Sequence, residues 1–436
     1  MGGVIRDDRQ AIRGPSPSAT ADAVLEHIDA GTNVIVPLAA GEPVTVMDAI
    51  EDAAETLEGV TVHQMHGLHD RPFLHGRHRG RLDYRAYFLS PVTRAAFNER
   101  GCDLVPCHFS EVPAILRRLP DPKLVVAAAS PMDRHGYFSL GTNADYIAAF
   151  IGSVPFFLEA NEQMPRTFGR NQLHVSQTAG WIQVDYPVVE VPPVVPGAID
   201  RQIAAFVSER IPDGATIQAG IGSIPNAVLE QLTDHRHLGI HTEMLSDGVI
   251  PLVLAGVVTG TQKVRRPTKM VATFALGTRQ LYDFLHENPA VELLPVDWVN
   301  DPRIIGQERR FVSINATLEV DLLGQAASET LNGRYYSGSG GQADFARGAM
   351  YAEHGQGFLV LNSTAHDGTV SRITPQLPAG SVVTTLKNTV DNIVTEFGVA
   401  ELRGRPIQER AAALISIAHP RFRDELTARA RELGYL

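Results

Sequence analysis

The chain has 436 residues, of which 44% are hydrophobic and 20% charged, and its formal net charge is −11. This length exceeds one ordinary hydrophobic core and suits two α/β domains. The negative charge argues against general nucleic-acid binding, so an anionic ligand needs a local basic pocket. The sequence shows neither a secretory leader nor an apolar run long enough to cross a membrane, and Cys102 and Cys107 are too few for a disulfide framework. We therefore expect a cytoplasmic enzyme.

The first 19 residues are polar and contain the run Pro15-Ser16-Pro17-Ser18. This composition predicts a loose arm over 1–19, followed by a helix that begins near Thr20. Residues 31–43 then combine a short apolar run with a Gly/Pro turn, which predicts a buried strand that leads into a helix.

The second half repeats this local plan. Residues 214–225 contain a turn glycine, an apolar run and a second turn, and a helical pattern follows over 226–232. Two halves with one plan indicate a duplicated α/β unit. The prolines of 191–197 block regular pairing and precede a helix expected near Ala198.

We therefore predict an N-terminal α/β domain over 20–191 and a C-terminal α/β domain over 192–436. Apolar runs at 124–129, 358–361 and 381–385 predict further buried strands. The predicted fold class is α/β, with two similar open domains whose sheets are mixed and largely parallel. Open sheets of this kind bind ligands at the carboxyl ends of their strands.

Two glycine-rich segments carry the first chemical signal. Residues 220–225 follow an apolar run, and residues 337–342 precede a helical pattern. Such turns can direct backbone N–H groups at an oxyanion or a phosphate. Glu243, between them in the chain, offers a carboxylate close to a strand end, and a carboxylate that faces an oxyanion hole suggests covalent acyl transfer.

Eight ordered sequence blocks resemble the acetyl-CoA hydrolase/transferase family, and within it the 4-hydroxybutyrate CoA-transferase branch. The resemblance covers nearly the whole chain and implies the two-domain CoA-transferase fold. The blocks are PCHFSEVP (106–113), SPMDRHGYFSLG (130–141), EANEQMPRTFG (159–169), GIGSIPNAV (220–228), HTEMLSDG (241–248), INATLEVDLLGQ (314–325), SGSGGQADFARGA (337–349) and VTEFGVAELRG (394–404).

The resemblance implies that Glu243 is the catalytic nucleophile. In the family this glutamate attacks an acyl-CoA thioester, becomes a mixed anhydride and is converted by the released CoA into a glutamyl-CoA thioester, which a carboxylate acceptor then attacks. CoA is accordingly a substrate, and no permanently bound metal or redox cofactor is expected. The family also contains hydrolases, in which water attacks the same thioester, and we keep that activity as the alternative. Similar enzymes are commonly homodimers, so a homodimer is expected.

Other positions receive roles around this nucleophile. The backbone N–H groups of Ile221 and Gly341 are our candidates for the oxyanion hole. The resemblance implies that Asn315 holds the pantetheine arm of CoA and that Glu396 supports the site from behind. The full predicted set for the oxyanion hole and CoA binding is Gly220, Ile221, Gly222, Ser223, Ile224, Gly340, Gly341 and Asn315.

Several motifs have competing interpretations. A dinucleotide-binding loop at 220–225 lacks the third glycine of that fingerprint, because position 225 is proline. Asp247 is expected to turn the chain and cap a helix from Val249 rather than to take part in chemistry. We assign no role to Cys102 and Cys107. Arg347 faces either CoA phosphates or solvent.

The histidines between 63 and 78 suggest zinc by their spacing, but the segment lacks an accompanying Cys or carboxylate pattern, so solvated or substrate-facing histidines are favoured. We expect the positively charged loop that holds His75, Arg77, His78 and Arg79 to border the acceptor pocket. Acetate, butyrate, 4-hydroxybutyrate and dicarboxylates all remain open as acceptors. A silent acyl-CoA-binding protein is disfavoured by the intact Glu243. The histidine set is His63, His66, His69, His75 and His78.

Overall fold

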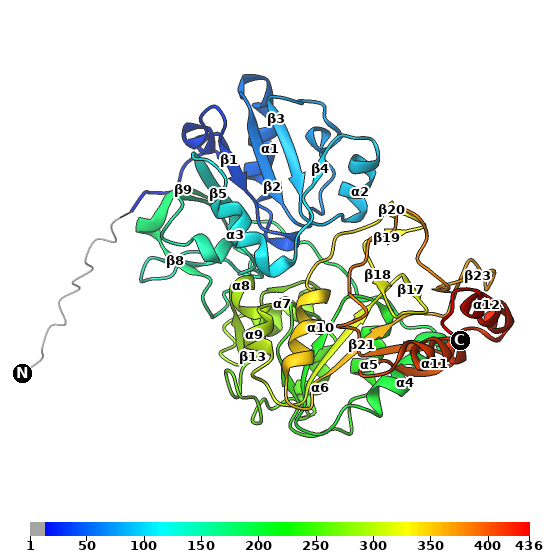
Figure 1. Ribbon diagram of the computed structural model, residues 1–436. Coiled ribbons are helices and arrows are strands. Elements are labelled where there is room, and N and C mark those ends of the chain that lie inside the picture. The colour runs from blue at the N-terminus through cyan, green and yellow to red at the C-terminus, as the bar shows by residue number, and fades with distance from the viewer. Residues whose placement is uncertain (1–13) are drawn as a thin grey trace, which may run out of the picture.

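The computed structural model describes residues 14–436 and has two lobes, the first of which is built on a seven-stranded sheet (Figure 1). All its strand pairs are parallel, in the order β4-β3-β2-β1-β5-β7-β9. The strands are β1 (Asn33–Ile35), β2 (Val60–Gln64), β3 (Leu82–Ala86), β4 (Asp103–Leu104), β5 (Lys123–Ala129), β7 (Phe156–Asn161) and β9 (Thr178–Val184).

A six-stranded sheet forms the second lobe, in the order β11-β10-β16-β21-β25-β26. Its strands are parallel except for the antiparallel hairpin of β25 and β26. The predicted α/β class with mixed, largely parallel sheets is therefore confirmed. The strands are β10 (Thr216–Ala219), β11 (Gly239–Ile240), β16 (Phe311–Ala316), β21 (Gln356–Val360), β25 (Asn392–Thr395) and β26 (Gly398–Glu401).

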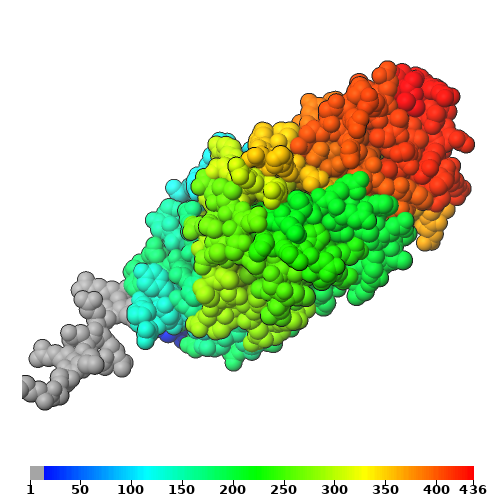
Figure 2. All heavy atoms as spheres, turned by 90° about the horizontal axis from the view of Figure 1, so that it is seen from below, coloured from blue at the N-terminus to red at the C-terminus, as the bar shows by residue number. Residues whose placement is uncertain are grey.

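Helices connect the parallel strands, and short two-stranded and three-stranded sheets line the connections. Figure 2 shows the orange and red C-terminal segment at one end of the molecule, with the cyan of the N-terminal lobe toward the other. The α-helices are α1 (Val44–Asp52), α2 (Pro91–Asn98), α3 (Val112–Arg117), α4 (Ala198–Ser208), α5 (Ser223–Glu230), α6 (Val249–Leu254), α7 (Arg279–Leu285), α8 (Val296–Val299), α9 (Pro302–Ile305), α10 (Gln342–Tyr351), α11 (Ile407–Ile417) and α12 (Pro420–Glu432).

The small strands flank these connections. β12 pairs with β14 and β13 pairs with β15, close to the second sheet in sequence. Their bounds, with those of the remaining short strands, are β6 (Tyr137–Ser139), β8 (Gln172–His174), β12 (Met244–Leu245), β13 (Met270–Ala272), β14 (Phe274–Ala275), β15 (Val291–Leu293), β17 (Glu319–Asp321), β18 (Ala326–Ala327), β19 (Thr330–Leu331), β20 (Arg334–Tyr335), β22 (Thr364–Ala365), β23 (Val370–Ser371) and β24 (Ile373–Thr374).

Both large sheets have a point at which the strand order reverses. In the first sheet, the connection after β1 leads to β2 on one side of it, and β5 pairs with β1 later in the chain on the other side. In the second sheet β10 lies in the same way between β11 and β16. Connections leave such a point in opposite directions, so a crevice opens at the carboxyl ends of the strands. Each sheet therefore has one natural ligand position.

The largest hydrophobic core runs through both lobes. It joins buried side chains of the first sheet, such as Val125 and Leu158, to buried side chains of the second, such as Ile217 and Ile314. The β5 run is buried along almost its whole length, as a strand covered on both faces requires. This continuous core holds the carboxyl ends of the two sheets in a fixed relation.

Three local predictions can be compared with the model. Helix α4 begins at Ala198, as expected, whereas the helix near Thr20 is a 3-10 helix over Ala21–His27. Residues 14–19 are not loose, because Ser18 and Pro15 form hydrogen bonds with Trp181. The rest of the predicted arm, 1–13, lies outside the described residues.

The strand predicted at 381–385 is wrong. This segment forms one isolated bridge, from Thr385 to Ala326, and no ladder. Its N–H groups bond instead to the Thr330 hydroxyl and the Ala326 carbonyl. An apolar run with scattered loop partners satisfies its backbone without joining a sheet.

Candidate active site

A cavity of about 140 Å³ opens at the carboxyl ends of β10 and β16, where the order of the second sheet reverses. Residues after β10 and β16 form one side, and the glycine segment before α10 forms the other. Both predicted glycine loops therefore meet at one cavity. Its lining residues are Phe88, Gln218, Ala219, Gly220, Ile221, Glu243, Met244, Asn315, Ala316, Ser339, Gly340, Gly341 and Gln342.

Glu243 contributes the carboxyl group of this cavity. Its Oε2 accepts a hydrogen bond of 2.7 Å from Nδ2 of Asn300, and the backbone N–H of Gly341 also faces the carboxylate. Burial raises the pKa of Glu243 to about 7, while Asn300 and Gly341 oppose part of that rise. The carboxyl group therefore changes its charge close to neutral pH, which suits a group that must ionise in order to react.

The backbone of Glu243 is fixed from the neighbouring small strand. Its carbonyl accepts hydrogen bonds from the N–H groups of Thr273 and Phe274, at 3.0 and 3.2 Å. These two hydrogen bonds hold the backbone of Glu243 in place, so only its side-chain torsions remain to be set. Asn300 and Gly341 set them.

Asn300 is in turn positioned by His241. This buried imidazole stacks on Trp298 with ring centroids 5.6 Å apart, and its Nε2 donates to the Val299 carbonyl at 2.7 Å. Burial lowers the pKa of His241 to about 3, so the ring is neutral. We infer a supporting role, because the ring holds the end of α8 from which Asn300 projects.

Only glycine fits at position 341. A Cβ atom there would lie 1.9 Å from Oε2 of Glu243 and 2.3 Å from Nδ2 of Asn300. Neighbouring Gly340 has a left-handed φ of 53° and lies against Phe88. The second glycine segment therefore serves the close approach of backbone to carboxylate, as an oxyanion hole requires.

Gln218 and Asn315 form a reciprocal amide pair on the opposite wall. Each side-chain nitrogen donates to the other's oxygen at 3.0 Å, and Asn315 also donates to the Ser313 hydroxyl. The pair lies on adjacent parallel strands, so its position follows from the register of the sheet. A fixed amide of this kind can exchange hydrogen bonds with an amide of a bound ligand.

The predicted residues are thus only partly brought together. Gly220, Ile221, Gly340, Gly341, Asn315 and Glu243 line the cavity, whereas Gly222, Ser223 and Ile224 begin α5 outside its lining. Glu396 also lies outside the lining, and both of its oxygens accept hydrogen bonds from Ser363.

The sequence reasoning missed Asn300, Gln218 and Phe88. None of them belongs to a motif with a spacing that points to chemistry. Their proximity to Glu243 depends on contacts between distant segments.

The prediction that Asp247 caps the following helix is wrong. The carboxylate of Asp247 accepts from the N–H of Thr278 before α7, and no side chain caps α6. Asp247 therefore joins two loops instead of capping its own helix. Arg347 is exposed on α10 and does not line the cavity, and the thiol of Cys102 donates to the Thr93 carbonyl.

Two of the five histidines are not solvated. His63 bonds to Tyr87 and Asn33 in the interior, and His66 packs against Phe88. Among residues 14–436 no group of three His, Cys, Asp or Glu side chains could hold a metal ion.

The expectation that the 75–79 loop borders an acceptor pocket receives no support. His75 is paired with Asp70 and Glu99 of the same protein, and His78 with Glu55. None of the loop residues lines the Glu243 cavity. The two histidines of this loop thus contact carboxylates of neighbouring segments and do not reach the site.

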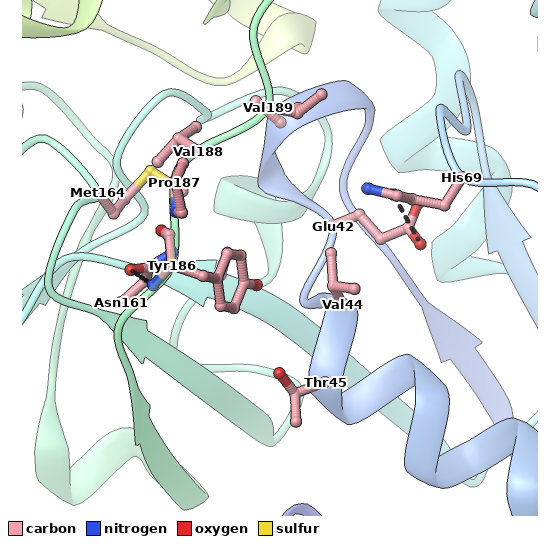
Figure 3. Close-up of a pocket in the computed structure, with 12 residues that line it drawn as sticks. Glu42, Val44, Thr45, His69, Asn161, Met164, Tyr186, Pro187, Val188 and Val189 are labelled. Atoms are coloured by element: carbon pink, nitrogen blue, oxygen red, sulfur yellow. Dashed lines mark hydrogen bonds and ion pairs between the residues drawn. The ribbon is translucent and has the colours of Figure 1, made fainter. Parts of the chain in front are cut away.

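A second cavity, of about 210 Å³, lies at the reversal point of the first sheet (Figure 3). Its buried Glu42 accepts hydrogen bonds from Gln64 and Arg71 at 2.9 and 3.0 Å and lies 3.3 Å from Nδ1 of His69. These partners lower the pKa of Glu42 although burial raises it. The protein's own cations therefore balance this carboxylate.

The N-terminus of the helix that starts at this second cavity already binds a carboxylate of the protein itself. Glu159 accepts from the N–H of Val46 at the start of α1, and the Tyr186 hydroxyl donates to the same carboxylate. An internal carboxylate thus fills the position where a phosphate would bind a helix N-terminus. At the start of α5, in the second lobe, no side chain caps the helix.

No helix within residues 14–436 is both long and apolar enough to cross a membrane.

The chain matches two family models. The acetyl-CoA hydrolase/transferase N-terminal domain covers residues 6–196, and the acetyl-CoA hydrolase/transferase C-terminal domain covers residues 277–430. Among curated relatives, the chain is 42% identical to succinyl-CoA:cyclohexane-1-carboxylate CoA transferase of Geobacter metallireducens, over 98% of this chain and 97% of that protein. It is 40% identical to 4-hydroxybutyrate coenzyme A transferase of Clostridium kluyveri, over 93% and 95%.

A solved structure shows the same fold. The crystal structure of 4-hydroxybutyrate CoA-transferase from Porphyromonas gingivalis superposes with a TM-score of 0.82 at 38% identity, covering 95% of this chain and 97% of that one. The family models, the relatives and this structure agree with the resemblance that the sequence blocks indicate. The chain belongs to the acetyl-CoA hydrolase/transferase family.

Proposed function

We propose that this protein is an acyl-CoA:carboxylate CoA-transferase that acts on short-chain acids and carries CoA on Glu243 between two half-reactions. The position of Glu243 is the observation that carries this proposal. Its carboxylate lines the cavity between the two glycine loops, is held by Asn300 and faces the N–H of Gly341. A carboxylate so placed can attack a thioester whose oxygen is received by backbone donors.

The chemistry begins when Glu243 attacks the acyl-CoA carbonyl and the CoA thiolate leaves, which gives a mixed anhydride. The thiolate then attacks the glutamyl carbonyl and expels the donor carboxylate, which leaves a glutamyl-CoA thioester. An acceptor carboxylate repeats these steps in reverse order, so Glu243 is regenerated and CoA ends on the acceptor. Every leaving group is a carboxylate or a thiolate, so the thioester energy is conserved.

Two features suit this cycle. The pKa of Glu243 near 7 leaves a useful ionised fraction at neutral pH while keeping the carboxylate nucleophilic. The cavity walls also carry Phe88 and Met244, which favour an acid with a short hydrocarbon body. The relatives named above act on cyclohexane-1-carboxylate and 4-hydroxybutyrate, which are acids of this class. A cytoplasmic homodimer is part of the proposal and rests on the family resemblance.

The test is to trap the thioester. The protein is incubated with acetyl-CoA, butyryl-CoA, succinyl-CoA or 4-hydroxybutyryl-CoA and then treated with borohydride, which reduces a glutamyl thioester to the alcohol. Its peptides are then analysed by mass spectrometry. We expect reduction at Glu243, none in Glu243→Gln, and unchanged labelling in the exposed control Glu353→Gln. Glu243 left unmodified by all four donors would overturn the proposal.

A chase separates the transferase from the hydrolase alternative. Adding acetate or butyrate to the loaded enzyme should convert bound CoA into the matching acyl-CoA. Release of free CoA at one rate, whether or not the acid is present, would instead establish the hydrolase.

A further inference from the structure

The two lobes are joined directly beside Glu243. The glycine segment before α10 belongs to the second lobe, yet two of its hydrogen bonds go to residues of the first. The Ser339 hydroxyl donates to the Cys107 carbonyl at 2.6 Å, and the Phe109 N–H donates to the Gly340 carbonyl at 3.0 Å. The loop that faces Glu243 is therefore held in place by the N-terminal lobe.

Asp344 completes this junction. It lies in the first turn of α10, three residues after Gly341, and only 2% of its surface is exposed. An acidic residue there usually faces solvent and complements the helix dipole. This side chain is buried instead, and its two oxygens accept from the N–H and the hydroxyl of Ser110, at 3.1 and 2.9 Å.

We propose that Asp344 is a positioning residue that docks the Gly341 loop onto Ser110 and places a buried negative charge beside Glu243, so that it sets the pH at which the nucleophile ionises. This inference rests on the proposed function of Glu243. Two buried carboxylates that share one environment ionise in sequence, because the first charge opposes the second. Asp344 accepts two hydrogen bonds from Ser110, and its pKa of about 6 lies below the value of about 7 for Glu243, so Asp344 ionises first.

The surrounding charges agree with this order. Asp344 is the charged side chain that raises the pKa of Glu243. On the other side, His108 lowers the pKa of Asp344 and Glu111 raises it, while burial keeps it near 6. Burial raises the pKa of Cys107 to about 12, so this thiol adds no charge at neutral pH.

Asp344→Asn tests the proposal with little change of shape. An amide at this position can accept from the Ser110 N–H and donate to its hydroxyl oxygen, so the docking survives while the charge is lost. We expect the acid limb of the pH profile for glutamyl-thioester formation to move down by about one pH unit. For each protein we divide the rate at pH 6 by its plateau rate at high pH. This ratio should be about fivefold larger for the variant than for wild type.

Ser110→Ala provides the second variant. It removes one donor to Asp344 while the backbone donor stays, so Asp344 is ionised for less of the pH range. The acid limb should move in the same direction but by less. Asp391→Asn is the control, because Asp391 is a half-buried carboxylate that likewise accepts a backbone N–H, and it lies directly before β25, away from the cavity.

The outcomes are distinct. An acid limb that stays at the wild-type pH in both variants, or that moves upward, overturns the role of Asp344, even if the rate falls at every pH. A limb that moves equally in Asp391→Asn overturns it as well. Loss of thioester formation at Glu243 in wild type at every pH would defeat the proposed function itself.

Discussion

Gly341 and Glu243 are so close that no side chain fits between them. The Cβ atom of any other residue at position 341 would lie 1.9 Å from Oε2 of Glu243, well below van der Waals contact. The φ of Gly341 is −98°, which other residues adopt freely, so the glycine is required for space and not for backbone conformation. The backbone of Gly341 therefore contacts the Glu243 carboxylate directly, and a methyl group at position 341 would break this contact.

We accordingly expect Gly341→Ala to lower kcat by at least about 10²-fold, because it displaces the carboxylate from its backbone donor. Stability should change less than activity, since the cavity allows the Glu243 side chain to rotate away. Gly357→Ala is the control, because a Cβ there would come no closer than 3.8 Å to Asp391. Turnover with butyryl-CoA and acetate compares the two, and equal rates would refute the proximity argument.

Asn300 makes a different prediction, about pH. Its hydrogen bond to Oε2 lowers the pKa of Glu243 against the effect of burial. Asn300→Ala should therefore move the acid limb of the rate to higher pH and reduce kcat at pH 7 by about 10-fold to 10²-fold, the value of a hydrogen bond to a charged group. A pH profile from 5.5 to 8.5 measures both effects. A limb that moves to lower pH would contradict this assignment.

Local patterns were enough to predict the elements that frame the site. The apolar run, glycine turn and helix at 214–232 are contiguous in sequence, and they form β10, the cavity loop and α5. Pattern alone failed at 381–385, because an apolar run looks the same whether its backbone partners form a strand or belong to scattered loops. Periodicity reports which faces are buried and not what covers them.

The partners of Glu243 could not be predicted in this way. Asn300 lies 57 residues from Glu243, and Ser110 lies 234 residues from Asp344. Neither contact follows from spacing, since the first depends on how loops of the second lobe pack together and the second on how the two lobes pack. The side chains of His75 and His78 misled in a similar way, because the carboxylates that contact them come from other segments.

Ionisation of the Glu243 side chain should also lower the free energy of unfolding as the pH rises. The pKa of Glu243 is about 7 in the folded protein, above the ordinary value of 4.5 for a glutamate side chain, so folding favours the protonated form. Stability is fully present below pH 4.5 and declines as pH rises toward 7. Glu243→Gln should thus raise the free energy of unfolding by up to about 3 kcal/mol at pH 8 and by little at pH 4.5. Urea unfolding at both values tests the sign, which reverses if Glu243 is held as a stabilised anion.

A substitution in the second cavity should lower stability and leave turnover unchanged. The Glu42 and Arg71 side chains are only 3% and 7% exposed and lie 3.0 Å apart, and Arg71 also pairs with the more exposed Asp48. Glu42→Gln keeps the shape and removes the buried partner of Arg71 while Asp48 stays, so stability should fall by less than the roughly 3–5 kcal/mol of a completely broken buried pair. Because neither residue lines the Glu243 cavity, the folded fraction should retain its turnover. Thermal unfolding and rates per folded molecule measure the two effects, and a variant of normal stability with slow turnover would place Glu42 in the reaction instead.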